Sequence, residues 1–163
     1  MRHIRMPLSA VASALLAGSA LAHDPVTWNG SEFHILLSGD ESGGSFGIFT
    51  ETVPGPAGPP MHVHEDADEA IILLKGEARV VSDGNERLIN AGEAAFAPRG
   101  AEHTFHILSE DGGKLLIMLT PAGFEGFFEA VAAEGLEIPQ DMDRINEIAT
   151  QFKQRLTGPP LAK

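Results

Sequence analysis

The sequence predicts an all-β domain, a sandwich or barrel of short strands, with one or two helices at its C-terminal end. Between residues 32 and 120, short apolar segments are separated by glycine, proline, aspartate and asparagine. From residue 124 onward, the apolar residues follow the spacing of a helix instead. The chain has 163 residues, 43% of them hydrophobic, which is enough for one domain with an adequate core.

The first predicted strands occupy residues 32–37 and 45–53. Residues 32–37 are rich in apolar side chains, and residues 45–53 alternate between apolar and polar ones. The glycine-rich stretch 39–44 is expected to form a loop. The stretch 54–60, rich in proline and glycine, is also expected to be a loop, because proline cannot donate a hydrogen bond within a central ladder.

The central segments predict a series of paired strands. Residues 70–74 are continuously apolar, as expected of a buried strand. The Asp-Gly-Asn turn at 83–85 predicts a tight hairpin between strands at 77–82 and 86–90. Further strands are expected at residues 94–97, 103–108 and 114–120.

The C-terminal segment, residues 121–163, is predicted to be helical. Gly135 would end a first helix, Pro139 would open a second, and Gly158 would end that one. The residues of the two apolar stripes are Phe124, Phe127, Phe128, Val131 and Ala132, then Ile138, Met142, Ile145, Ile148, Phe152 and Leu156. Such stripes pack against a core far more often than they bind a cofactor, so we expect both helices to cover the β domain.

The N-terminus has the pattern of a secretory signal, predicted to occupy residues 1–22. Arg2 and Arg5 precede an uncharged apolar run at residues 8–21, and an Ala-Leu-Ala cleavage site ends at Ala22. The alternative is a membrane anchor, but the apolar run is shorter than the roughly 20 residues that a span requires. We expect cleavage after Ala22 and a secreted or periplasmic protein without a stable membrane span. The mature chain would begin with an N-terminal strand region at residues 23–44.

Charge and cysteine content exclude several functional classes. The formal net charge is −12, so the chain is a poor candidate for binding nucleic acid or anionic membranes. Cysteine is absent, which rules out a disulfide framework and thiolate catalysis.

A cluster of candidate metal ligands stands out in the middle of the chain. His62 and His64 are two residues apart, so on a strand both imidazoles lie on one face. Glu69 follows a short acidic turn, and His103 follows a Pro-x-Gly turn, so neighbouring strands could supply both side chains. Imidazole and carboxylate ligands suit a divalent ion such as Mn, Fe, Ni, Co, Cu or Zn. A histidine pair alone also occurs by chance on polar strands.

Several of these residues belong to two motifs. The residues are His62, His64, Glu69 and Gly76 in the first motif, and Gly92, Pro98, Gly100 and His103 in the second. Together they resemble the motifs of the cupin superfamily, over roughly residues 45–120. The resemblance implies a jelly-roll β-barrel with a core at 45–120. It also implies that the three histidines and the glutamate bind one metal ion.

Two positions depart from the cupin pattern. Pro56 stands where a glycine opens the first motif, and Ile107 stands where an asparagine often closes the second. Neither position is a metal ligand in the family, so the expected ligand set is unchanged.

Residues 58–64 and 120–128 narrow the resemblance to single-domain cupins of the quercetin dioxygenase-like group. That likeness implies a divalent metal, dioxygen as a reactant, a flavonol-like aromatic or enolic substrate, and frequent homodimers. The likeness bears on fold and metal more strongly than on substrate, since one fold hosts many chemistries.

Glu69 is the candidate for a catalytic role. A weakly held carboxylate can leave the metal and accept a substrate proton, although Glu69 could equally be a fixed ligand. Phe105 shares strand parity with His103 and should line a substrate pocket, while His106 has the opposite parity. The other candidate pocket residues are Phe46, Met61 and Phe96. All four could instead fill the interior of the barrel.

Three functions remain open at the level of sequence. The first is a metal-dependent dioxygenase acting on a small aromatic or enolic molecule. The second is a cupin metalloenzyme of isomerase or lyase type. The third is a non-catalytic protein that binds a small ligand or a metal.

Overall fold

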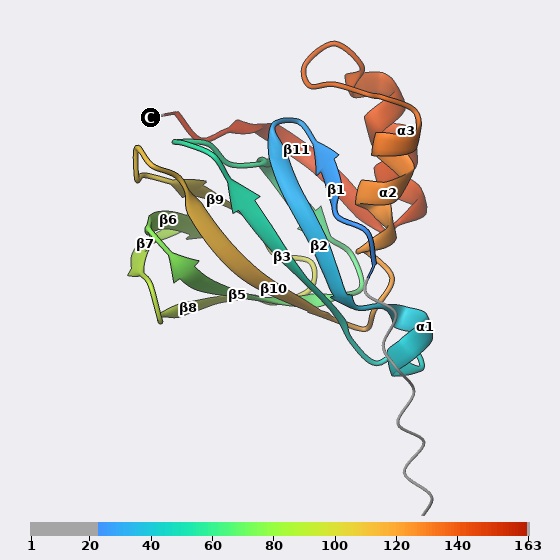
Figure 1. Cartoon of the computed structure of the whole chain (residues 1–163), viewed down its shortest axis with the longest axis horizontal. Coiled ribbons are helices and arrows are strands. Elements are labelled where there is room, and N and C mark those ends of the chain that lie inside the picture. Colours follow the sequence, from blue (N-terminus) through green and yellow to red (C-terminus); the bar gives the residue numbers. More distant parts are fainter. Residues whose placement is uncertain (1–22, 163) are drawn as a thin grey trace, which may run out of the picture.

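The computed structural model describes residues 23–162, which fold into two antiparallel sheets that face each other (Figure 1). One sheet has the strand order β1-β2-β3-β10-β5-β8, and the other has the order β11-β4-β9-β6-β7. The strands of the first are β1 (Val26–Trp28), β2 (Ser31–Leu37), β3 (Gly47–Val53), β10 (Gly113–Thr120), β5 (Asp68–Lys75) and β8 (Ala94–Ala97). Those of the second are β11 (Gln154–Pro160), β4 (Pro60–His64), β9 (Glu102–Ile107), β6 (Glu77–Ser82) and β7 (Asn85–Asn90). The predicted all-β jelly roll is confirmed.

The space between the sheets is filled by alternate side chains of the strands. On the first sheet, Phe49 of β3 lies opposite Ile117 of β10, which lies opposite Ile71 of β5. On the second sheet, Val80 of β6 lies opposite Phe105 of β9. All five are almost fully buried. Each such side chain contributes about 1.5–3 kcal/mol by leaving water, so these rows hold the two sheets together.

The predicted hairpin at residues 83–85 is confirmed between β6 and β7. Asp83 and Gly84 have φ values of 47° and 74°, the left-handed conformation that a two-residue hairpin turn requires at both central positions. Glycine adopts this conformation without strain, and aspartate tolerates it better than most residues.

Two helices cover the side of the sandwich where β1 and β11 lie (Figure 1). Helix α2 (Gly126–Ala133) packs against β1, and helix α3 (Met142–Gln151) packs against β11. Their buried residues join the same hydrophobic core as the strands. Trp28 of β1 fastens this arrangement, because its indole N–H donates a 2.7 Å hydrogen bond to the carbonyl oxygen of Leu136, just beyond α2.

The prediction that the second helix continues to Leu156 is wrong. Helix α3 ends at Gln151, and Lys153 has a φ of 57°, which interrupts the helix. Strand β11 then pairs with β4, so that Gln154 lies opposite His64 and Leu156 opposite His62. Pairing with the edge of β4 outweighs the local helical pattern, which is why the apolar spacing was misleading here.

The N-terminal region is more structured than predicted. The expected loop at 39–44 contains a short helix, α1 (Gly39–Ser42), capped by Ser38 and Glu41. Strands β1 and β2 pair in succession onto β3 of the same chain. The predicted signal at residues 1–22 lies outside the described residues. Within 23–162, no helix has the length and apolar character needed to cross a membrane.

Candidate metal centre

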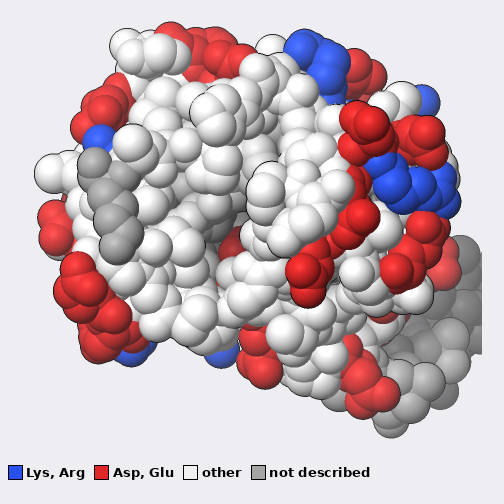
Figure 2. All heavy atoms as spheres, turned by 90° about the horizontal axis from the view of Figure 1, so that it is seen from above, with Lys and Arg blue, Asp and Glu red and all other residues white. Residues whose placement is uncertain are grey.

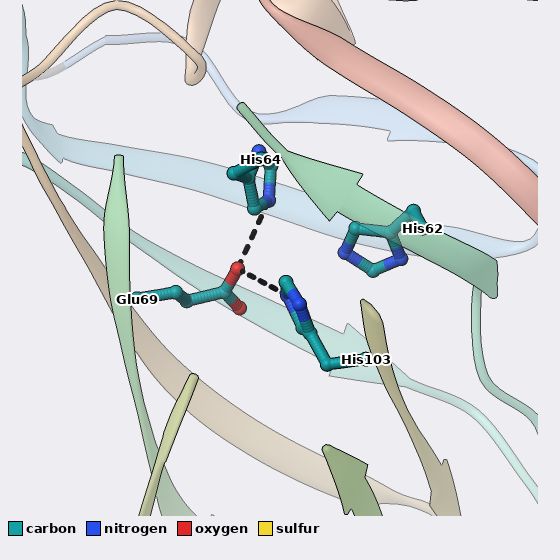
Figure 3. A group of neighbouring side chains, drawn as sticks. All are labelled: His62, His64, Glu69 and His103. Carbon is teal, nitrogen blue, oxygen red and sulfur yellow. Dashed lines mark hydrogen bonds and ion pairs between the residues drawn. The ribbon is translucent and has the colours of Figure 1, made fainter. Parts of the chain in front are cut away.

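Three strands bring the four predicted ligands together inside the barrel (Figure 3). His62 and His64 lie on β4, Glu69 on β5 and His103 on β9. The register places His62 directly opposite His103. All four side chains are buried, and one potential ligand atom from each lies within 4.8 Å of the others. The spacing predicted from sequence therefore becomes one compact group.

Backbone carbonyl groups orient two of the imidazoles. The Nδ1 of His62 lies 2.8 Å from the carbonyl oxygen of Pro60, and the Nδ1 of His103 lies 2.9 Å from that of Ala101. A carbonyl oxygen can only accept, so each Nδ1 carries the proton and donates it. The Nε2 of each ring faces the group, so in the neutral ring its lone pair is available for a metal, the usual outer-shell arrangement of metal-binding histidines.

Glu69 lies at the centre of the group. Its Oε2 is 3.0 Å from Nε2 of His64 and 3.1 Å from Nε2 of His103. Burial alone would raise the pKa of Glu69, but the hydrogen bond with His103 and the close contact with the His64 imidazole hold that pKa well below its usual value. The carboxylate is therefore ionised at neutral pH and can serve as an anionic ligand.

The pKa values of the two histidines opposite each other on β4 and β9 are shifted in opposite directions. Burial and the neighbouring imidazoles His103 and His64 lower the pKa of His62 to about 3, so His62 is neutral. Burial opposes protonation of His103, but the hydrogen bond to Glu69 raises the pKa of His103 above its ordinary value.

The residues fit a divalent metal ion. The buried Nε2 of His64 lies beside Glu69 but forms no hydrogen bond. This nitrogen therefore lacks a partner, and a metal cation bound to it would supply one. Three imidazoles and one carboxylate offer nitrogen and oxygen ligands together, a combination that suits borderline transition metals. Four protein ligands leave coordination positions open for substrate in a five- or six-coordinate ion.

An ion pair outside the group connects two of its strands. The guanidinium of Arg99, in the turn before β9, donates to both carboxylate oxygens of Asp68, at 3.1 and 2.8 Å. The side-chain and backbone hydrogen bonds from Arg99 lower the pKa of Asp68 to about 2. Asp68 adjoins Glu69, so this bidentate contact links the start of β5 to the turn that leads to His103.

The group opens onto a small apolar cavity of about 50 Å³. Apart from the metal-binding side chains, its lining is almost entirely aromatic and aliphatic. The lining residues are Trp28, Phe49, Pro59, Pro60, Phe105, Ile117, Phe124, Phe127, Phe128, Ile138, Ile145, Gln154 and Leu156. Phe124 lies directly on the site, with its ring centroid 4.3 Å from that of His64. Such walls exclude bulk water from the ligand atoms.

Of the four predicted pocket residues, only Phe105 lines this cavity. Phe46 precedes β3 and is 42% exposed, and Phe96 faces outward from β8 and is 61% exposed. Met61 alternates with His62 along β4, so its side chain leaves the face that carries the ligands. None of these three side chains lines this cavity, and strand parity explains the orientation of Met61 and Phe96.

Sequence reasoning missed two buried polar residues. Gln154 was assigned to a helix, but it faces the metal group from β11, and its Oε1 has no hydrogen-bond partner. Glu51 shares strand parity with Phe49 and points into the barrel, where a second cavity of about 70 Å³ adjoins the first. The alternation of apolar and polar residues along 45–53 could have identified Glu51 as inward-facing. No local signal identified Gln154.

Comparison with known proteins identifies families and structures that resemble this chain. The cupin domain family matches residues 49–119. These residues have the sequence pattern of a cupin domain. All four ligands of the candidate centre fall within it.

A curated relative shares sequence with part of the cupin domain. Quercetin 2,3-dioxygenase of Bacillus subtilis (strain 168) is 36% identical over 50 residues. Those residues make up 31% of this chain and 15% of that enzyme, so the chain spans only a small part of the relative's length.

Solved structures share the fold at low sequence identity. The structure of KdgF from Halomonas sp. is 20% identical, with a TM-score of 0.55, covering 62% of this chain and 88% of that one. An RmlC-like cupin from Shewanella frigidimarina is 19% identical, with a TM-score of 0.54, covering 68% of this chain and 93% of that one. At these identities the likeness establishes the jelly-roll fold alone.

Proposed function

We propose that this protein is an exported, metal-dependent dioxygenase-like enzyme that acts on a small enolic molecule. The observation that carries the proposal is the buried group of three histidines and a glutamate, whose ligand atoms lie within 4.8 Å of one another. This group borders an apolar cavity, so protein side chains do not cover it on all sides. The partial similarity to quercetin 2,3-dioxygenase supports an oxygenase over other cupin chemistries.

The residues have separable tasks. A divalent ion held by His62, His64, Glu69 and His103 would stabilise the oxyanion of a substrate enol and, if redox-active, allow reaction with dioxygen. Oε2 of Glu69 lies beside two imidazoles, and this carboxylate would accept the enol proton on leaving the metal. The phenylalanines around the cavity exclude water that would compete for the open positions.

The cavity favours a substrate smaller than a flavonol. Pockets for drug-sized ligands measure roughly 300–1,000 Å³, whereas the cavity beside the metal centre measures about 50 Å³. Phe124, Phe127 and Phe128 fill the remaining space near the helices. Without movement of these rings, the site suits a compact enol or hydroxy-ketone.

The charge of the molecule favours a neutral substrate. Figure 2 shows a hollow bordered mostly by uncharged side chains in the face seen from above, with acidic side chains farther out and fewer basic ones. The net charge of −12 repels anions that approach the molecule. This supports a neutral small molecule as partner and disfavours nucleic acid.

The first test is elemental analysis of the purified protein. About one equivalent of a transition metal per chain, retained through desalting, is the expected result. Absence of metal after reconstitution with Mn, Fe, Co, Ni, Cu and Zn in turn would reject the proposal.

The second test separates oxygenase from isomerase or lyase chemistry. Oxygen uptake by the metal-loaded protein is measured with small enols and hydroxy-ketones, and with quercetin as a large comparison substrate. Metal-dependent uptake with the small molecules supports the proposal. Metal-dependent proton exchange or isomerisation of the same molecules without uptake would identify an isomerase or lyase instead.

Export is tested by sequencing the N-terminus of the protein recovered from a secreting host. A mature chain beginning at His23, in the periplasm or medium, is expected. A chain that keeps Met1 and stays with the membrane would reject export by a cleaved signal.

A further inference from the structure

We infer that Gln154 binds the substrate and selects neutral molecules that carry a hydroxyl group in addition to the oxygen that meets the metal group. The inference deepens the proposed function and rests on it. It names a specificity residue and the chemical class that this residue recognises: compact molecules with two separate oxygen functions.

The position of Gln154 follows from the register of the sheet. On β11 it lies directly opposite His64, and Leu156 lies opposite His62. Side chains opposite each other in an antiparallel pair share a face, so Gln154 and His64 point into the barrel together. Both line the cavity beside the metal group.

The amide oxygen of Gln154 is buried without a hydrogen-bond partner. Gln154 is 6% exposed, and its Oε1 has no hydrogen-bond partner. A buried amide oxygen without a donor is destabilising, and a hydrophobic residue of similar volume would avoid that cost. Buried polar groups that break this rule concentrate at functional sites.

The rest of the cavity makes Gln154 distinctive. Apart from the metal-binding side chains, the other lining residues are apolar or aromatic. The one other hydrogen-bonding side chain, the indole of Trp28, already donates its N–H to Leu136. A ligand in an apolar cavity is oriented by its few polar contacts, so the amide of Gln154 fixes the end of the substrate that the metal group does not hold.

A hydroxyl group is the partner that fits the amide. Oε1 accepts a hydrogen bond and Nε2 donates one, and a hydroxyl can supply the complement of either. A carboxylate would satisfy Nε2 but not Oε1, because an ionised carboxylate has no proton to donate. The inferred substrate is therefore neutral at this end.

The test uses protein loaded with Zn²⁺, which is redox-inert, so that binding is measured without turnover. The probes are pairs of short hydroxamic acids of equal chain length, which bind zinc at one end. One member of each pair ends in a methyl group and the other in a hydroxyl group: propanohydroxamic with 3-hydroxypropanohydroxamic acid, and butanohydroxamic with 4-hydroxybutanohydroxamic acid. Affinities are measured by titration calorimetry.

In the wild-type protein, the hydroxylated member of at least one pair should bind about 3- to 10-fold more tightly, as one hydrogen bond would give. In Gln154→Leu this preference should disappear or reverse, with one zinc per chain retained. The matched control is Gln151→Leu, which changes an exposed glutamine at the end of α3 and should keep the preference.

Stability gives a second readout that a purely structural role would not produce. Removing an unpartnered amide should raise the melting temperature of ligand-free Gln154→Leu by about 2–4 °C. A lower melting temperature with an unchanged hydroxyl preference would mean that Gln154 is structural, and would overturn the inference. Stoichiometric zinc with no hydroxyl preference in the wild type would overturn this inference alone. Failure of the wild type to hold zinc or any other transition metal would overturn the proposed function and the inference with it.

Discussion

Single residues decide whether the barrel holds a metal. The carbonyl groups of Pro60 and Ala101 each hold one imidazole in the tautomer that leaves Nε2 free. The sequence predicted the ligand residues from their parity and spacing. It could not predict their tautomers, because the carbonyl partners depend on how each strand begins.

Removing one ligand should abolish the metal site. We expect His62→Ala to bind metal at least about 100-fold more weakly than wild type, since one of four protein ligands is lost. The control is His34→Ala, which removes a half-buried histidine on β2, away from the group. Elemental analysis after desalting measures both. Equal metal content in His62→Ala and wild type would show that the metal binds elsewhere.

Glu51 should make stability depend on pH. Burial, opposed by a hydrogen bond from Ser31 and reinforced by the charge of Glu69, raises the pKa of Glu51 from 4.5 to about 7. The folded state then holds a proton that the unfolded state has lost between these values. This contribution to stability is therefore complete below about pH 4.5 and is lost as the pH rises through about 7.

The variant Glu51→Gln should remove that dependence. Relative to wild type, it should gain on the order of 3 kcal/mol in free energy of unfolding between pH 4.5 and pH 8. Urea denaturation at several pH values measures the difference. The control Glu32→Gln changes an exposed glutamate on the neighbouring strand and should show no such trend. Parallel stability curves for Glu51→Gln and wild type would contradict the raised pKa.

At the scale of elements, the sequence predicted the strands of the cupin core better than the C-terminal strand β11. The strands between 45 and 120 have period-two patterns and turn residues, which are local signals. Strand β11 has no such signal: Phe152 and Leu156 continue the helical spacing of α3, and only pairing with β4 makes 154–160 extended. The same long-range pairing placed Gln154 in the site, so the sequence missed both together.

The segment that leads into α2 sets the size of the cavity. The ring of Phe124 contacts His64 and stacks on Phe127 at 5.5 Å. Another cavity, of about 120 Å³, lies against Phe124 and is also lined by His64 and Phe152. Phe124 thus separates this cavity from the one beside the metal centre, and His64 lines both.

Shortening the Phe124 side chain should lower the stability of the protein and enlarge the cavity. Phe124→Ala should lose about 3 kcal/mol in free energy of unfolding, as expected for a buried phenylalanine. The zinc-loaded variant should also bind benzohydroxamic acid more tightly than wild type does, because the two cavities merge. Urea denaturation and calorimetry measure these effects. The exposed Phe46 provides the control, and a similar loss of stability in Phe46→Ala would argue against a specific role for Phe124.

The outer face of the six-stranded sheet carries a row of uncharged side chains. One row of cross-strand neighbours runs over β3, β10, β5 and β8 through Ile48, Met118, Ala70 and Phe96. Beside it, Leu116 lies opposite Ile72. The row contains no charge, whereas the molecule as a whole carries −12. Within residues 23–162, no helix covers this face.

We propose that a second copy of the chain covers this face. Two subunits with this net charge repel each other, and an uncharged contact surface adds no further repulsion between them. An apolar row of this kind can meet its own copy across a two-fold axis, as in most homodimers. Sedimentation velocity of the wild type should therefore show a dimer. A monomer at about 100 μM would reject this.

Charge introduced into the row should separate the subunits. Phe96 is 61% exposed, and Phe96→Asp places one carboxylate from each copy into the apolar contact, where an unpaired charge is strongly unfavourable. We expect Phe96→Asp to be a monomer. Its melting temperature should fall only by the amount that dimerisation contributes to stability. Leu88→Asp is the matched control, because Leu88 is 54% exposed but lies on β7 of the other sheet. If Leu88→Asp dissociates the dimer and Phe96→Asp does not, the interface lies on the five-stranded sheet, and the apolar row needs another explanation.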